Sequence, residues 1–132
     1  MEAVPVSATS PLVVHLVALV DDDASIRRSV GNLLLSEGFR VAAFASAEAF
    51  LASSTRGVAA CLVLDIHLGG MSGLDLLERL EAEERARTVI LTARADDKIR
   101  DRARAAGVSV VLNKPVEADA LLAAGRAVVQ SG

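Results

Sequence analysis

The chain alternates short apolar runs with segments in which apolar residues recur at helical spacing. The apolar runs predict five strands, which we expect to end at Val20, Phe44, Asp65, Thr92 and Asn113. The segments between and after them predict five helices, at about 24–37, 47–56, 72–80, 96–106 and 117–129. A regular alternation of strand and helix without internal repeats is typical of an α/β fold with parallel strands and right-handed crossovers.

Local signals support several of these boundaries. Asp23 stands where it can cap the first helix, and Gly38 is a stop signal at the end of that helix. Gly69-Gly70 predicts a loop after the third strand. Ser72 with Asp75 resembles a capping box at the start of the third helix.

The strand ends carry most of the reactive side chains. The first strand is followed by Asp21-Asp22, the third ends at Asp65, the fourth at Thr92, and Lys114 follows the fifth. Open parallel sheets bind ligands at the carboxyl ends of their strands, so we expect these groups on one edge. In the strand order 2-1-3-4-5, Asp21-Asp22 would lie beside Asp65.

This group of side chains suits phosphoryl transfer. Crowded carboxylates repel one another, so either one is protonated or a cation such as Mg²⁺ joins them. The Lys114 ammonium and the Thr92 hydroxyl could contact phosphoryl oxygens, and an Asp carboxylate can attack phosphorus. Each residue alone has an ordinary interpretation, for example Asp22 or Asp23 as a helix cap and Lys114 as a solvated cation. Together, at the ends of four strands, they favour a shared site.

The composition narrows the class of protein. The 132 residues are enough for one domain, and the hydrophobic content of 52% with only 2% aromatics predicts an aliphatic core. The formal net charge of −3 gives no general attraction to nucleic acid or to a membrane surface. The single cysteine, Cys61, lies in an apolar run, which predicts a reduced, buried thiol in a cytoplasmic protein.

Five short segments together resemble the receiver domain of bacterial two-component response regulators, the CheY-like family. They are Val20–Asp23, Leu64–His67, Met71–Gly73, Leu91–Ala93 and Asn113–Pro115. The resemblance covers residues 12–130 and implies a flavodoxin-like, doubly wound (βα)5 sandwich of three layers. Residues 1–11 are expected to form a flexible arm, and we expect no output domain in this chain.

The resemblance also implies a phosphorylation site and a metal site. Asp65 would accept a phosphoryl group from a sensor histidine kinase or a phosphotransfer protein. Mg²⁺, or Mn²⁺, would be held by Asp22, Asp65 and the backbone carbonyl of His67, with Asp21 reaching it largely through water. The domain would act as a phosphoacceptor switch and not as an enzyme with external turnover.

Further roles follow from the same resemblance. Thr92 and the backbone N–H of Ala93 would bind the phosphoryl oxygens, and Lys114 would bridge to them across an expected cis bond to Pro115. His67 and Arg94 would flank the phosphoryl group, and we expect them to shield it from water and slow its hydrolysis.

The chain departs from the family pattern at two places. Receivers commonly carry Tyr or Phe three residues before the lysine, where this chain has Val111. The loop after Asp65 commonly contains Pro, where this chain has Gly69-Gly70, so we expect a loop that orders on metal or phosphoryl binding.

An unidentified output partner is expected on the face formed by the helix at 96–106, the strand at 109–113 and the last helix. Residues 85–104 hold seven basic and three acidic side chains, which fits either that docking role or a solvated helix. Because the basic stretch has no aromatic residue and the sequence shows no helix-turn-helix pattern, we expect no direct binding of nucleic acid. The apolar run at 12–20 is too short to span a membrane.

Two other classes of protein share parts of this pattern. A haloacid dehalogenase-like phosphatase also uses an aspartate at a strand end, but it needs a further acidic pair after another strand and would leave Asp65 without a role. A flavodoxin-like FMN carrier needs a phosphate loop rich in Gly, Ser and Thr after the first strand, where this chain carries Asp21 to Asp23.

Overall fold

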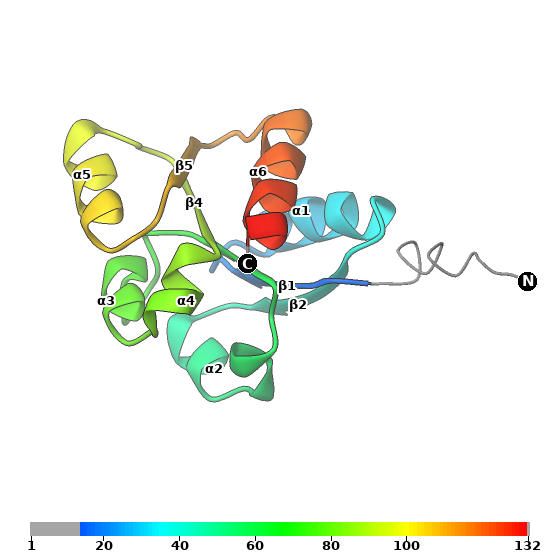
Figure 1. Ribbon diagram of the computed structural model, residues 1–132, viewed down its shortest axis with the longest axis horizontal. Coiled ribbons are helices and arrows are strands. Elements are labelled where there is room, and N and C mark those ends of the chain that lie inside the picture. The colour runs from blue at the N-terminus through cyan, green and yellow to red at the C-terminus, as the bar shows by residue number, and fades with distance from the viewer. Residues whose placement is uncertain (1–13, 132) are drawn as a thin grey trace, which may run out of the picture.

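The computed structural model describes residues 14–131, which form one five-stranded parallel sheet flanked by helices (Figure 1). The strand order is β2-β1-β3-β4-β5, as expected. The strands are β1 (Leu16–Val20), β2 (Arg40–Phe44), β3 (Cys61–Leu64), β4 (Thr88–Thr92) and β5 (Val110–Asn113). The arm predicted at residues 1–11 lies outside the described part of the chain.

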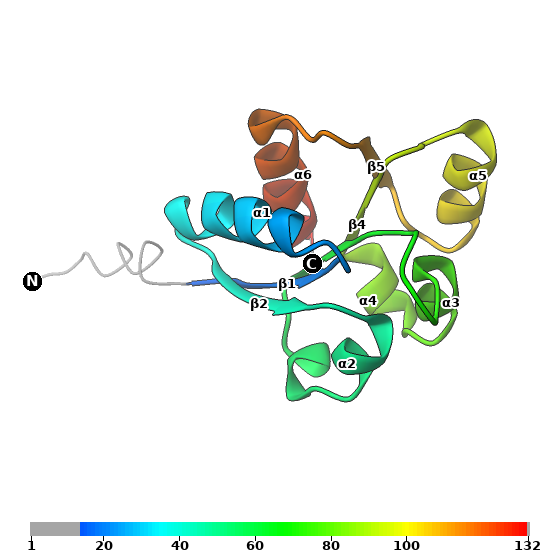
Figure 2. The same cartoon turned by 180° about the vertical axis from the view of Figure 1, so that it is seen from behind.

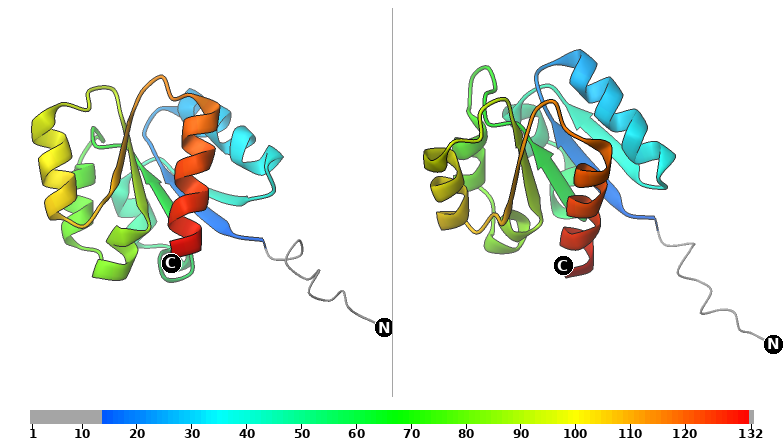
Figure 3. Two further views of the ribbon diagram at one scale, coloured as in Figure 1. Left: turned by 45° about the horizontal axis from the view of Figure 1, so that its top comes forward. Right: turned by 90° about the horizontal axis from the view of Figure 1, so that it is seen from above.

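The helices cover both faces of the sheet, which gives the three layers that the family resemblance implies (Figures 1 and 2). One face is covered by α1 (Ala24–Ser36) and α6 (Ala118–Ser131). The other face carries α2 (Ala47–Leu51), the 3-10 turn η2 (Ser54–Gly57), α3 (Gly73–Glu78), α4 (Ala82–Ala86) and α5 (Asp97–Ala105). Figure 3 shows the sheet between these two layers of helices.

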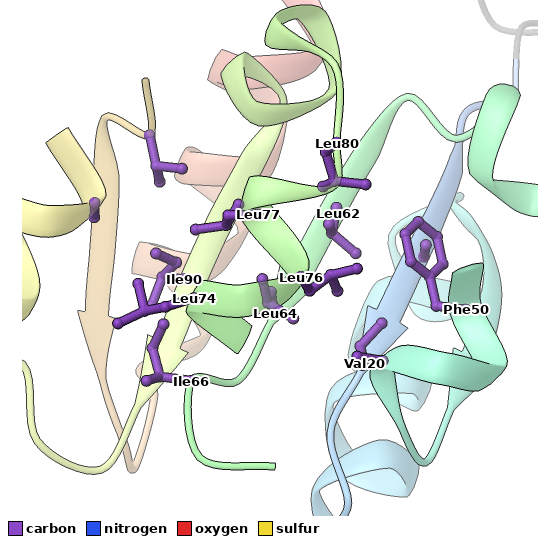
Figure 4. Close-up of a cluster of buried hydrophobic side chains, with 14 residues drawn as sticks. Val20, Phe50, Leu62, Leu64, Ile66, Leu74, Leu76, Leu77, Leu80 and Ile90 are labelled. Carbon is purple, nitrogen blue, oxygen red and sulfur yellow. The ribbon is translucent and has the colours of Figure 1, made fainter. Parts of the chain in front are cut away.

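Two apolar clusters, one on each face of the sheet, form the core. Successive side chains of a strand point to opposite faces, so β3 contributes Leu62 and Leu64 to one cluster and Cys61 and Val63 to the other. Figure 4 shows the first cluster, in which β3 and β4 pack against α3 and Phe50 of α2. All four residues of β3 are buried, so the strand that precedes Asp65 is held on both faces.

The third crossover differs from the single helix expected at 72–80. The structure has two short helices, because α3 ends at Glu78 and α4 begins at Ala82. The Ser72 hydroxyl accepts the N–H of Asp75 at 3.1 Å and so caps α3, whereas the capping box belongs to Glu81 and Glu84 of α4. Charged residues dominate α4, and its apolar periodicity is too weak to reveal it in the sequence.

The burial of Cys61 makes its chemistry a test of the fold. Desolvation raises the pKa of this thiol to about 12, so it is protonated at neutral pH. We expect iodoacetamide to label Cys61 only after unfolding, and mass spectrometry against urea concentration would measure this. Because the folded pKa lies above the unfolded one, the thiol should also weaken the fold as pH rises above about 9. A Cys61→Val variant should lose that part of the alkaline dependence, and equal labelling of folded and unfolded protein would contradict the burial.

Candidate functional site

The central pair of strands brings the two acidic segments together. Val20 of β1 lies opposite Leu64 of β3, and the N–H of Asp65 donates to the carbonyl of Val20 at 3.0 Å. Carboxylate oxygens of Asp21, Asp22 and Asp65 all lie within 4.8 Å of one another. The sheet order thus places these three acids together, as the positions of the strand ends predicted.

Lys114 joins this group from the far strand of the sheet. Its Nζ lies 2.8 Å from Oδ2 of Asp21 and 3.3 Å from Oδ2 of Asp65. Its backbone N–H donates to the carbonyl of Thr92 at 2.8 Å, and the bond to Pro115 is cis, as expected. Burial alone would lower the pKa of Lys114, but the hydrogen bond to Asp21 and the charges of Asp65 and Asp21 outweigh it and raise the pKa. Lys114 is therefore a charged residue of this site whose ammonium group is fixed by Asp21 and Asp65.

The three consecutive acids after β1 have separate environments. Asp21 is only 1% exposed, and both its oxygens are engaged, because Oδ1 accepts the N–H of Asp23 at 2.9 Å and Oδ2 faces Lys114. Asp22 is exposed. Asp23 caps α1, and hydrogen bonds from the hydroxyl and N–H of Ser25 lower its pKa. The helix-capping interpretation is thus confirmed for Asp23, and Asp22 has an exposed carboxylate.

Asp65 combines burial with a charged neighbour. It is 5% exposed, its Oδ1 accepts the N–H of His67 at 3.2 Å, and its Oδ2 faces Lys114. Burial raises its pKa above the ordinary value of an aspartate, although the bond from His67 and the charge of Lys114 oppose this. A carboxylate that resists ionisation here gains from any further cation brought beside it.

The remaining candidates lie at the end of β4 and on the loops that follow β3 and β4. Thr92 is fully buried, and its Oγ1 accepts the N–H of Arg94 at 3.4 Å. Ala93 follows it at the start of an exposed loop. The side chains of His67 and Arg94 are exposed. The shielding role expected for these two side chains stays a prediction.

Three residues to which the sequence assigned no side-chain role also make contacts around the site. Arg27, one turn into α1, donates to the carbonyl of Asp21 at 2.8 Å. Glu48 of α2 accepts the N–H of Met71, in the loop after Asp65, at 3.2 Å. Asn113 at the end of β5 accepts the N–H of Ala95 at 3.0 Å. The spacing of Arg27 from Asp23 is a weak local signal, whereas the other contacts join segments that only the fold brings together.

Several basic side chains of the stretch at 85–104 bind other parts of the domain, so fewer of them are available at the surface than the sequence suggests. Arg85 donates to the backbone carbonyls of Leu80 and Ala106, and Arg100 donates to two other backbone carbonyls. Arg104 pairs with Asp101 across one turn of α5 at 3.3 Å. Several of these cations thus stabilise the fold, which weakens the interpretation of the whole stretch as a docking surface.

The donor set at the strand ends fits a hard divalent cation. Asp21, Asp22 and Asp65 offer only oxygen atoms, which Mg²⁺ and Mn²⁺ prefer. Asp22 has an exposed carboxylate that a cation could reach, and because burial raises the pKa of Asp65, a cation beside it would relieve the cost of ionising Asp65. The chemistry of the residues present therefore suits the metal that the sequence suggested.

Removing the Lys114 cation should destabilise the metal-free protein. In a Lys114→Met variant the buried Asp21 carboxylate loses its ion pair, so we expect a loss of about 3 kcal/mol in the free energy of unfolding. Mg²⁺ should then stabilise the variant more than the original protein, because the ammonium no longer repels it. Urea unfolding with and without Mg²⁺ measures both effects. Lys98→Met, at an exposed site on α5, is the control, and equal losses for both variants would contradict the prediction.

Comparison with known proteins identifies the family. The family model described as "Response regulator receiver domain" matches residues 17–126. The chain belongs to the response regulator receiver domains. The matched segment contains all five strands of the sheet, apart from Leu16 at the start of β1. It also contains all the candidate site residues.

Individual relatives agree with this assignment. Nodulation protein W of Bradyrhizobium diazoefficiens is 40% identical over 110 residues, which are 81% of this chain and 48% of that protein. The transcriptional regulatory protein FixJ of Azorhizobium caulinodans is 35% identical over 112 residues, 84% of this chain and 53% of that protein. The chain thus spans about half the length of these curated relatives.

Solved structures resemble the receiver in fold as well. Response regulator StyR matches with a TM-score of 0.78 at 40% identity, over 90% of this chain and 61% of that one. A CheY-like receiver domain protein from Methanospirillum hungatei has a TM-score of 0.82 at 26% identity, over 90% of this receiver and 96% of that chain.

These findings confirm the predicted CheY-like fold and a receiver function in two-component signalling, and they set aside the haloacid dehalogenase-like phosphatase. Within residues 14–131, the receiver has no helix with the length and apolar character that crossing a bilayer requires.

Proposed function

We propose that this receiver accepts a phosphoryl group on Asp65 in a reaction that depends on Mg²⁺. The observation that carries the proposal is the meeting of Asp65 with Asp21, Asp22 and Lys114 at one edge of the sheet. Within this group Asp65 is buried at the end of the central strand β3, and its Oδ2 lies 3.3 Å from the Lys114 ammonium, whereas Asp21 makes the shorter ion pair of 2.8 Å with the same lysine.

Different residues of the site have different roles in this proposal. Asp22, Asp65 and the backbone carbonyl of His67 would hold Mg²⁺ or Mn²⁺, and Asp21 would contact it largely through water while it orients Lys114. The bound ion would supply positive charge beside the phosphoryl oxygens. Thr92 and the N–H of Ala93 would donate to those oxygens, and Lys114 would exchange part of its contact with Asp65 for one with the phosphoryl group.

The transfer itself forms one bond and breaks one bond. An Oδ of ionised Asp65 attacks phosphorus in line with the donor nitrogen of a phosphohistidine, and the P–N bond breaks with its electron pair left on the imidazole, which takes up a proton. No further co-reactant is needed. The donor would be a sensor histidine kinase or a phosphotransfer protein, and the receiver would return to its free state by hydrolysis, which exposed His67 and Arg94 would slow.

The signal would pass to an output partner through the face formed by α5, β5 and α6. In a protein as long as the curated relatives, that partner would be a second domain, since the matched segment makes up only about half of each relative. Binding and release of such a partner, and not turnover of an external substrate, would be the activity of the receiver.

A direct test is incubation with acetyl phosphate and Mg²⁺, followed by intact-mass measurement and peptide mapping. We expect one phosphoryl group per chain, located on Asp65 and lost when EDTA removes the metal. Labelling of another residue, or no labelling with acetyl phosphate, phosphoramidate or a phosphorylated kinase domain, would overturn the proposal.

A further inference from the structure

The loop between β4 and α5 is held on both sides at Ala95. The N–H of Ala95 donates to Oδ1 of Asn113 at 3.0 Å, and its carbonyl accepts from Nε of Arg100 at 3.2 Å. Asn113 is the last residue of β5, and Arg100 lies in the first turn of α5. One loop residue is thus connected to the strand on one side and to the helix on the other.

Arg100 also contacts the strand directly. Its Nη1 donates to the carbonyl of Val111 at 3.3 Å, and Val111 lies on β5, which pairs with β4 at one end of the sheet order. Figures 1 and 3 show α5 beside this edge of the sheet. A planar guanidinium can bind two carbonyls in different directions at once, which a lysine ammonium cannot do with the same geometry. A single side chain therefore links the loop, the helix and the edge strand.

The position of this loop matters for the candidate site. It begins directly after Thr92, and it contains Ala93, whose N–H is proposed to bind a phosphoryl oxygen. The carbonyl of Thr92 is held by the N–H of Lys114 at 2.8 Å, so β4 is fixed where the loop starts. A displacement of Ala95 would therefore either break its hydrogen bonds to Arg100 and Asn113 or move these two partners with it.

We propose that Arg100 is a positioning residue that holds the loop at 93–96 against β5 and passes a displacement of that loop to Val111 and α5. The aliphatic side chain of Val111 has no polar atom that could bond to the loop. The link between the loop and β5 therefore runs through Arg100 and the backbone carbonyl of Val111. The transmission step rests on the proposed function, because a phosphoryl group at the proposed site is what would move the loop. The positioning step does not, because Arg100 makes its contacts in the protein without a ligand.

The first test uses the ligand-free protein. An Arg100→Met variant loses the hydrogen bonds to the carbonyls of Ala95 and Val111, so the loop should open more readily and the Ala95 amide should exchange with solvent about fivefold faster, which corresponds to about 1 kcal/mol in the free energy of local opening. The amide of Leu19, in the centre of the sheet, should keep its rate after correction for global stability. Arg100→Lys should not restore protection at Ala95, and Arg104→Met, which removes only an exposed pair with Asp101, should not reduce it. An unchanged Ala95 rate in Arg100→Met would overturn the proposal.

The second test adds beryllofluoride and Mg²⁺ as a mimic of the phosphoryl group. In the original protein, amide NMR shifts should change at Ala93, Ala95 and Val111. In Arg100→Met the changes at Ala93 should persist while that at Val111 is lost, and an equal response of Val111 in both proteins would overturn the transmission. If beryllofluoride fails to bind the original protein, the proposed phosphoryl site fails, whereas the exchange rates still decide whether Arg100 positions the loop.

Discussion

Asp65→Asn is expected to reduce phosphoryl labelling by at least about 1,000-fold, because an amide oxygen cannot replace the carboxylate nucleophile. The same change should stabilise the metal-free fold near neutral pH. Burial raises the folded pKa of Asp65 above its unfolded value, so the folded state binds more protons and loses stability as pH rises between the two values. Asparagine carries no charge, so the free energy of unfolding of the Asp65→Asn variant should not fall over this pH range.

Two measurements separate these effects. Intact-mass analysis after incubation with acetyl phosphate and Mg²⁺ reports the labelling, and urea unfolding from pH 3 to pH 7 reports the stability. The gain of the variant should vanish at the acid end, where Asp65 is protonated in both folded and unfolded chains. Asp75→Asn, at an exposed site on α3, is the matched control and should be labelled like the original protein. A labelled Asp65→Asn variant would exclude Asp65 as the acceptor.

Gly73→Ala should cost about 2–3 kcal/mol in the free energy of unfolding, because the backbone after Asp65 leaves no room for a methyl group. A Cβ on Gly73 would lie 2.3 Å from the carbonyl oxygen of Asp65 and 2.8 Å from the Cα of Ile66. The N–H of Gly73 also donates to the carbonyl of Ile66 at 2.9 Å. Relief of the clash must therefore shift the segment that positions the Asp65 carboxylate, so phosphoryl labelling should also become slower.

Gly69→Ala is the matched control for this effect. Gly69 lies in the same loop, but a Cβ there meets no atom within 4 Å, so we expect a change within about 0.5 kcal/mol. Thermal and urea unfolding compare the two variants, and the rate of labelling by acetyl phosphate checks the site. Equal stability of the two alanine variants would show that the approach of Gly73 to Asp65 is not as close as the structure has it.

Much of the fold followed from local patterns in the sequence. The all-apolar run before Asp65 is the buried central strand β3, and Asp23 caps α1 as its position suggested. The sequence pattern did not predict α4, because the charged residues at 81–87 lack the apolar periodicity that identifies a helix. Predictions of this kind depend on interactions within a few residues, so they succeed where the local signal is strong.

The residues of the candidate site were predictable because each stands at the end of an apolar run, and parallel strands bring their ends to one edge. Their contacts were not predictable. The sheet order brings Lys114 to 2.8 Å from Asp21, so Asp21 forms an ion pair with it. The neighbouring Asp22 is exposed. The role of Arg100 likewise depends on two carbonyls, at Ala95 and Val111, that are distant in sequence from each other. The sequence by itself determined which groups could react. The tertiary structure alone decided which of them touch, because hydrogen bonds and ion pairs act over a few ångströms and link residues that the chain separates by tens of positions.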